Sequence, residues 1–174
     1  MRSGNRALVL RTLLALLLAG LLGACGFQLR GAYVLPFDKI YITLPETNEL
    51  QAQLKRALTT GSNARVVGAQ KDAQATLLIL DDRNAKNILS LAATGQAREF
   101  QLVRSFVFRV VDSKGRDWLP QTRIEIHREI SFSDNLVLSK DLEEALLWRD
   151  IQLDLVQQVM RRLAASKPPL EVTE

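Results

Sequence analysis

From residue 99 to residue 132 the chain alternates apolar and polar side chains, with a turn in the middle. The apolar positions share one parity on each side of the turn: Phe100, Leu102, Phe106, Phe108, Val110, then Ile124, Ile126, Ile130 and Phe132. The polar positions of opposite parity include Arg109, Arg123, Glu125, His127 and Glu129. Because successive strand residues point to opposite faces, the pattern predicts a long antiparallel hairpin with one dry and one wet face. Residues 112–117 have the composition of its turn.

Centring this hairpin on its turn predicts its register. The expected pairs are Phe108 with Ile124, Phe106 with Ile126, and Phe100 with Phe132. The same register sets Arg104 opposite Arg128 on the dry face, where like charges repel and buried charges need partners. A bulge could turn one arginine outward, or carboxylates such as Asp150 or Asp154 could pair with them. Alternatively, the two guanidinium groups form an anion site, because paired arginines bind phosphate well.

Apolar residues at helical spacing predict two helices. The first runs from about Glu49 to Thr60, with Asn48 as its N-cap. The second begins at Asp141 as N-cap, carries acidic residues in its first turn and ends before Pro168. Its apolar stripe consists of Leu142, Leu146, Leu153, Val156, Met160 and Leu163.

Three shorter apolar segments predict further strands, at residues 39–44, more weakly at 64–67, and at 76–80. The run at 76–80 is typical of a central strand buried on both faces, and residues 81–95 continue it either as strand or as loop. Together these elements predict an α+β fold, a two-layer sandwich. Two helices would pack on one face of a mostly antiparallel sheet of about four strands, in a single domain at 39–165. Residues 166–174 are expected to form a flexible tail.

The N-terminal 24 residues have the layout of a secretory signal peptide. Arg2, Arg6 and Arg11 precede a leucine-rich core too short to span a bilayer, and small residues lead to Cys25. A cysteine at this place is typical of a bacterial lipoprotein, in which it is acylated and becomes the mature N-terminus. Residues 25–38 would then be a lipidated tether. By analogy with enteric lipoproteins, Gly26 in place of an aspartate favours the outer membrane.

Charge and composition exclude several functions. The chain has 23 basic and 19 acidic residues, and losing the three arginines of the signal leaves 20 and 19. A net charge of +1 gives no reason to expect a nucleic-acid partner. His127 is the single histidine, and no catalytic motif, metal-ligand spacing or cofactor fingerprint is present. We therefore expect no enzyme, metal or cofactor.

Three motifs resemble the family of LptE lipopolysaccharide-assembly lipoproteins: CGFQLRG at 25–31, GQAREF at 95–100 and LSKDLEE at 138–144. The resemblance implies an outer-membrane lipoprotein on the periplasmic face that forms a complex with the LptD β-barrel. There it would plug the barrel, help it assemble, and contact lipopolysaccharide on its way to the surface. Lys140 lies in a motif that matches a basic position linked to glycolipid binding in the family.

Candidate site residues come from these arguments. Lys140, Arg104 and Arg128 are candidates for lipopolysaccharide binding. The wet-face residues Arg109, Arg123, Glu125, His127 and Glu129 are candidates for contact with the barrel, because a barrel lumen is polar. Alternative functions are an auxiliary lipoprotein of another envelope lipid-transport machine, or a lipid-modifying hydrolase, which the missing nucleophile and base disfavour.

Overall fold

The computed structural model describes residues 32–131 and 137–169 of the 174-residue chain. The chain divides into two compact units, Met1–Gly31 and Ala32–Glu174, and every described residue belongs to the second unit. Its elements are, in order, β1 (Lys39–Ile42), α2 (Glu49–Gly61), β2 (Arg65–Val66), the short 3₁₀ helix η1 (Gln70–Asp72), β3 (Ala75–Leu91), β4 (Ala97–Val111), β5 (Asp117–Ser131) and α3 (Val137–Ala164).

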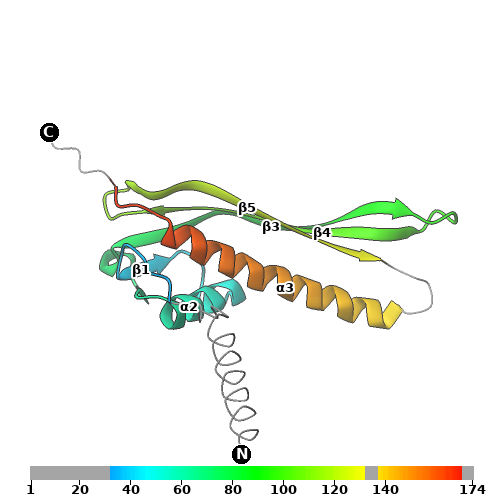
Figure 1. Ribbon diagram of the computed structural model, residues 1–174, viewed down its shortest axis with the longest axis horizontal. Helices are drawn as coiled ribbons and strands as arrows, with labels where there is room; N and C mark the ends of the chain where they lie inside the picture. The colour runs from blue at the N-terminus through cyan, green and yellow to red at the C-terminus, as the bar shows by residue number, and fades with distance from the viewer. Residues whose placement is uncertain (1–31, 132–136, 170–174) are drawn as a thin grey trace, which may run out of the picture. The chain divides into compact units, whose positions relative to one another are not determined.

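The strands form one mixed sheet in the order β2-β1-β3-β4-β5. β1 pairs in parallel with both β2 and β3, whereas β3, β4 and β5 pair antiparallel. A parallel neighbour requires a crossover, and α2 provides it between β1 and β2. α2 and α3 lie together beneath one face of the sheet (Figure 1). The predicted α+β sandwich is therefore confirmed, but its sheet has five strands, two of them joined to β1 in parallel, rather than about four.

The core lies between the inner face of the sheet and the two helices. Apolar side chains from every layer are fully buried there, the largest being Phe106, Phe108, Ile40, Leu50, Leu54, Leu58, Leu77, Leu102, Ile151, Leu155, Met160 and Leu163. The predicted N-cap of α2 is confirmed: Asn48 Oδ1 accepts hydrogen bonds from the backbone of Leu50 at 2.8 Å and Gln51 at 3.4 Å.

Of the two alternatives for residues 81–95, the strand extension is observed as far as Leu91. The turn at Gly95 follows. Gly95 has a φ of 82°, a conformation that favours glycine. The expectation of burial on both faces holds only at the start of β3. Leu80 is 49% exposed, because the strand is bulged between Ile79 and Asp81 and has no neighbour on its outer edge there.

The β4–β5 hairpin keeps the predicted faces but not the predicted register. Phe106 lies opposite Ile124, Arg104 opposite Ile126, and Arg128 opposite Leu102, a displacement of two residues. The pairing begins with Val111 opposite Asp117, which centres the turn on residue 114 rather than on residue 116, and the two irregularities near Val110 recover only half of that offset. A shift of two residues preserves the parity of each side chain, so the dry face remains dry. The expected Phe132 lies outside the described residues.

α3 begins at Val137, four residues before the predicted N-cap, so Asp141 lies within the helix and no acidic residue occupies its first turn. The predicted apolar stripe is also wrong in its first half. Val156, Met160 and Leu163 are buried, but Leu142, Leu146 and Leu153 are 66%, 64% and 51% exposed. α2 is short and covers only the C-terminal half of α3, so no element in the described part of the chain covers the earlier leucines (Figure 1). Among the described residues, no helix is long and apolar enough to cross a membrane.

Asp112 organises the β4–β5 turn. Its Oδ1 accepts hydrogen bonds from the backbone N–H groups of Lys114 at 2.8 Å and Arg116 at 2.9 Å, and Arg116 Nε donates to its Oδ2 at 2.7 Å. Desolvation raises the pKa of this carboxyl, but the hydrogen bonds from Arg116 and Lys114 outweigh it and hold the pKa below its ordinary value of 3.8.

We predict that Asp112→Asn lowers the melting temperature near neutral pH, and that this difference disappears as the pH falls below 3.8. A depressed pKa contributes stability only while the carboxyl is ionised, so the contribution is present above the ordinary value and lost through the folded value. Circular dichroism melts from neutral to acidic pH measure it, with Asp72→Asn as control. A difference that is the same at every pH would contradict the role of the charge.

Candidate functional site

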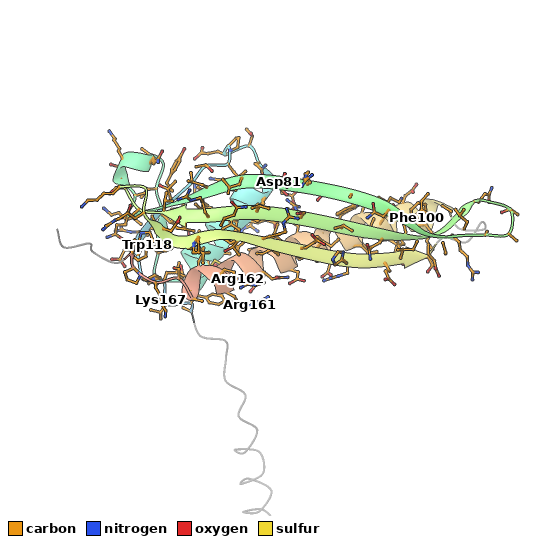
Figure 2. The ribbon with its side chains drawn as sticks, turned by 90° about the horizontal axis from the view of Figure 1, so that it is seen from above. Asp81, Phe100, Trp118, Arg161, Arg162 and Lys167 are labelled. Carbon is orange, nitrogen blue, oxygen red and sulfur yellow. The ribbon has the colours of Figure 1, made fainter. Side chains whose placement is uncertain are left out.

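Figure 2 shows the domain from the side of the sheet that the helices leave uncovered, and the exposed positions that alternate along β5 carry charged side chains. Arg123, Glu125 and His127 have side chains 59%, 43% and 47% exposed. His127 Nε2 lies 3.2 Å from Glu125 Oε1, and Arg123 Nη1 lies 3.9 Å from Glu125 Oε2. On β4, Arg109 pairs with Asp117 at 2.8 Å. We call Arg109, Arg123, Glu125, His127 and Glu129 the polar face.

Arg104 lies on the other side of the sheet, between β4 and α3, with its side chain only 8% exposed. Its Nε donates to Asp82 Oδ1 at 3.0 Å and its Nη2 to Asp82 Oδ2 at 2.8 Å, a bidentate pair. Nη1 donates to Gln152 Oε1 of α3 at 3.1 Å. Each guanidinium nitrogen of Arg104 thus has a protein partner.

Arg128 makes the corresponding contact from β5. Its Nε and Nη2 donate to Asp150 Oδ2 at 2.9 Å and to Asp154 Oδ2 at 3.3 Å, and its Nη1 to the His127 carbonyl. The bond to Asp150 raises the pKa of the guanidinium, and Asp154 adds to it against the effect of desolvation. Carboxylates on the final helix, one of the explanations that the sequence left open, therefore account for this arginine.

Lys140 lies in the first turns of α3, because the helix begins before the predicted start at Asp141. Its ammonium group donates to Glu143 Oε2 at 2.7 Å, and its side chain is 18% exposed. It stands beyond the part of α3 that packs on α2, close to Glu144, which binds Lys86 of β3 at 2.6 Å. Cys25, the predicted lipidation site, lies outside the described residues.

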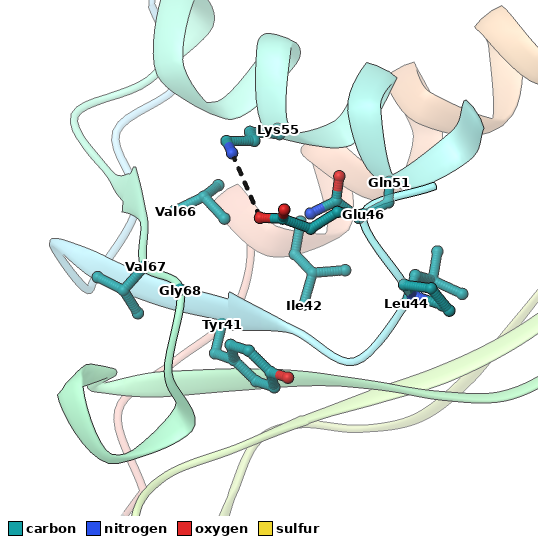
Figure 3. Close-up of a pocket in the computed structure, with 10 residues that line it drawn as sticks. Tyr41, Ile42, Leu44, Glu46, Gln51, Lys55, Val66, Val67 and Gly68 are labelled. Carbon is teal, nitrogen blue, oxygen red and sulfur yellow. Dashed lines mark ion pairs between the residues drawn. The ribbon is translucent and has the colours of Figure 1, made fainter. Parts of the chain in front are cut away.

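A pocket of about 180 Å³ opens at the ends of β1 and β2, beneath the start of α2 (Figure 3). Lys55 and Glu46 point toward each other across it, with Lys55 Nζ 3.9 Å from Glu46 Oε1. Tyr41, Gln51 and Val67 complete much of its wall. Across the described part of the chain, no group of histidine, cysteine or acidic side chains is arranged to hold a metal ion.

The model of the family described as LptE, lipopolysaccharide-assembly, matches residues 37–163 of this chain. That match spans nearly the whole described domain, from the segment before β1 to the last turn of α3. The chain belongs to the LptE family.

Solved structures of lipoproteins share the LptE fold seen here. A lipoprotein B from Nitrosomonas europaea is 35% identical with a TM-score of 0.70, over 80% of this chain and 91% of its own. The rare lipoprotein B from Shewanella oneidensis is 23% identical with a TM-score of 0.63, over 74% and 95%. A minor lipoprotein from Acinetobacter baumannii is 24% identical with a TM-score of 0.62, over 78% and 99%. No curated protein is similar enough to this chain to count as a match.

In this member of the LptE family, the sequence did not reveal the acidic partners of Arg104. Asp81 and Asp82 suggest at most an acid–base pair, and adjacent strand side chains should point to opposite faces. The pairing of β3 with β4 agrees with this expectation of opposite faces, because Asp81 lies opposite Val107 and Asp82 lies opposite Phe106. Asp82 thus shares the inner face with Arg104, and opposite charges of the same parity on neighbouring strands were the signal that could have found the pair.

We predict that Asp82→Asn lowers the free energy of unfolding by about 2–4 kcal/mol, because it leaves the buried Arg104 charge without a carboxylate. Arg83→Gln, which breaks the exposed 2.8 Å pair with Asp81, should cost less than about 1 kcal/mol. Urea denaturation of the two variants measures both values. Adding Arg104→Met to Asp82→Asn should restore part of the loss, and a further loss would show that the pair is not the cause.

Proposed function

We propose that this protein is an outer-membrane lipoprotein, acylated on Cys25, that acts without catalysis in lipopolysaccharide delivery. It forms a complex with the LptD β-barrel on the periplasmic face, plugs the barrel and helps it assemble. Membership of the LptE family and the likeness to lipoproteins support an assembly role in the envelope. The proposed contacts with the barrel and with lipopolysaccharide are argued from residues on the surface of the domain.

The observation that carries the barrel contact is the polar face. Two helices cover one side of the sheet, so the charged row on β5 is left uncovered on the other (Figure 2). Some of its charges are already paired, as Arg123 is with Glu125 within the face and Arg109 is with the neighbouring Asp117. Such a surface exposes polar groups but little net charge, which suits the hydrated lumen of a barrel.

For contact with lipopolysaccharide we favour Lys140 over the two arginines. The nitrogens of Arg104 and Arg128 are occupied by protein acceptors, and Arg104 is almost buried. The ammonium group of Lys140 has three donors, of which Glu143 takes one. A phosphate could therefore bind Lys140 without displacing Glu143.

We predict that Arg123→Glu with His127→Glu reduces co-purification of the barrel with a tagged protein at least several-fold, because like charges would then line β5 beside Glu125 and Glu129. The control is Arg56→Glu with Arg149→Glu, at exposed positions of the two helices, which removes slightly more positive charge than the sheet variant does. The measurement is affinity purification from outer membranes followed by quantitative mass spectrometry. Equal recovery of the barrel from the sheet variant and the control would reject the polar face as its contact.

We further predict that the mature protein incorporates palmitate and that Cys25→Ala abolishes the label. The variant should keep an uncleaved N-terminus, because lipid attachment precedes cleavage in this class of protein. Metabolic labelling and the intact mass of the exported protein measure both effects. Recovery of wild-type protein with residues 1–24 attached and an unmodified thiol would refute the lipoprotein assignment.

A further inference from the structure

The starts of four strands, β1, β2, β3 and β5, lie together at one end of the domain. The registers set Lys39 of β1 beside Arg65 of β2, Ile40 of β1 beside Ala75 of β3, and Val111 of β4 beside Asp117 of β5. Thr76 of β3 lies opposite Val111, so all five strands meet at this end. The 3₁₀ helix η1 and the β4–β5 turn lie here as well, because each directly precedes one of these strands.

Four basic side chains stand at this end of the sheet. Lys39, Arg65, Lys71 and Lys114 are all exposed. Within the described residues none of the four side chains forms a hydrogen bond or an ion pair.

Three more basic side chains come from the end of α3. Arg161 and Arg162 lie in its last turn and are exposed. Ser166 is buried and caps the helix, because its backbone N–H and its Oγ donate to the Leu163 carbonyl at 3.2 and 2.7 Å. This cap holds the exposed Lys167 beside the last turn, and Figure 2 shows the three side chains at one edge, near Trp118 of β5.

We call these seven residues the basic end: Lys39, Arg65, Lys71, Lys114, Arg161, Arg162 and Lys167. Nearby acids do not neutralise it. Asp112 and Asp117 are already paired with Arg116 and Arg109, which leaves Asp38 and Asp72. The dipole of α3 explains arginines in its last turn, but it does not explain the four basic residues contributed by the sheet and its turns.

The described chain also begins at this end. Tyr33 N–H donates to the carbonyl of Gly61 at 2.7 Å, and Gly61 closes α2 just before β2 starts. Ala32 is the seventh residue after Cys25. A chain of that length spans at most about 25 Å. An acyl anchor on Cys25 therefore keeps Ala32, and the end of the domain that holds it, near the membrane surface.

We propose that the basic end docks on the anionic phospholipid headgroups of the membrane that holds the anchor. The orientation rests on the proposed acylation of Cys25, whereas the charge attraction does not. A lipid chain and a polybasic surface are the two signals that together give stable attachment. The mature chain has 20 basic and 19 acidic residues, so the positive charge is concentrated at this end and not spread over the domain.

The test uses the full mature chain, residues 25–174, with Cys25→Ser so that no lipid contributes. Its binding is measured by co-sedimentation with vesicles of phosphatidylcholine alone and of phosphatidylcholine mixed with phosphatidylglycerol. The basic-end variant carries Arg161→Gln, Arg162→Gln and Lys167→Gln. The control carries Arg56→Gln, Arg98→Gln and Arg149→Gln, three exposed arginines away from the basic end that remove the same charge. Circular dichroism confirms that each variant is folded.

We expect binding to the phosphatidylglycerol vesicles but not to phosphatidylcholine alone, and weaker binding at high salt. Each basic residue near an anionic surface strengthens binding about fivefold, so the basic-end variant should bind at least about tenfold more weakly, while the control changes little. No binding, or an equal loss in both variants, would overturn the proposal. Binding that requires lipopolysaccharide in the vesicle would overturn the phospholipid assignment. The vesicle experiment does not depend on palmitate labelling or on recovery of the barrel. A failure of the proposed function and a failure of this proposal can therefore be distinguished.

Discussion

The domain depends on the contact between α3 and the inner face of the long strands, and the chemistry of this contact changes along the helix. From Ile151 to Leu163, α3 buries apolar side chains against the sheet and α2, and this burial provides most of the stabilisation. Before Ile151 the apolar packing is only partial, at Leu147 and Trp148, and ion pairs add to it. Glu144 binds Lys86 and Asp150 binds Arg128, where α2 no longer covers the helix. Ion pairs of this kind contribute little net free energy, but they fix where the helix lies.

This division explains why two inward-facing arginines are tolerated in a sheet that is otherwise dry. Arg104 lies on the inner face between Leu102 and Phe106, which are both fully buried, so its charge needs a polar neighbour there. Arg104 and Arg128 reach acceptors from two directions, the sheet for Asp82 and the helix for Gln152, Asp150 and Asp154. The arginines therefore join sheet to helix, and a ligand at Arg104 would have to break this connection.

Sequence reasoning could predict the features that local periodicity determines. The alternation around Phe106 and Ile124 assigned the faces of the hairpin correctly, and Asn48 marked the start of α2. It could not predict features that depend on distant elements or on irregular backbone. The centre of the turn and two bulges set the hairpin register, and the pairing of β1 with β2 carries almost no signal because β2 has two residues. Leu142 matched the helical stripe, but its burial needed a longer α2. For the candidate site, the exposure of β5 was predictable and strand parity could have indicated the Asp82 acceptor of Arg104, whereas its acceptor Gln152 depends on how α3 packs.

The proposed contacts use different parts of one domain and do not compete. The polar face lies along β5, whereas the basic end lies where the strands start, so a domain attached to headgroups by its end still presents the side of its sheet. Their charge patterns also differ. On the polar face His127 and Arg123 both adjoin Glu125, which suits a hydrated partner of mixed charge. At the basic end Lys39 and Arg65 lie side by side and neither side chain forms an ion pair within the described residues, and two adjacent cations are most stable beside an extended anionic surface.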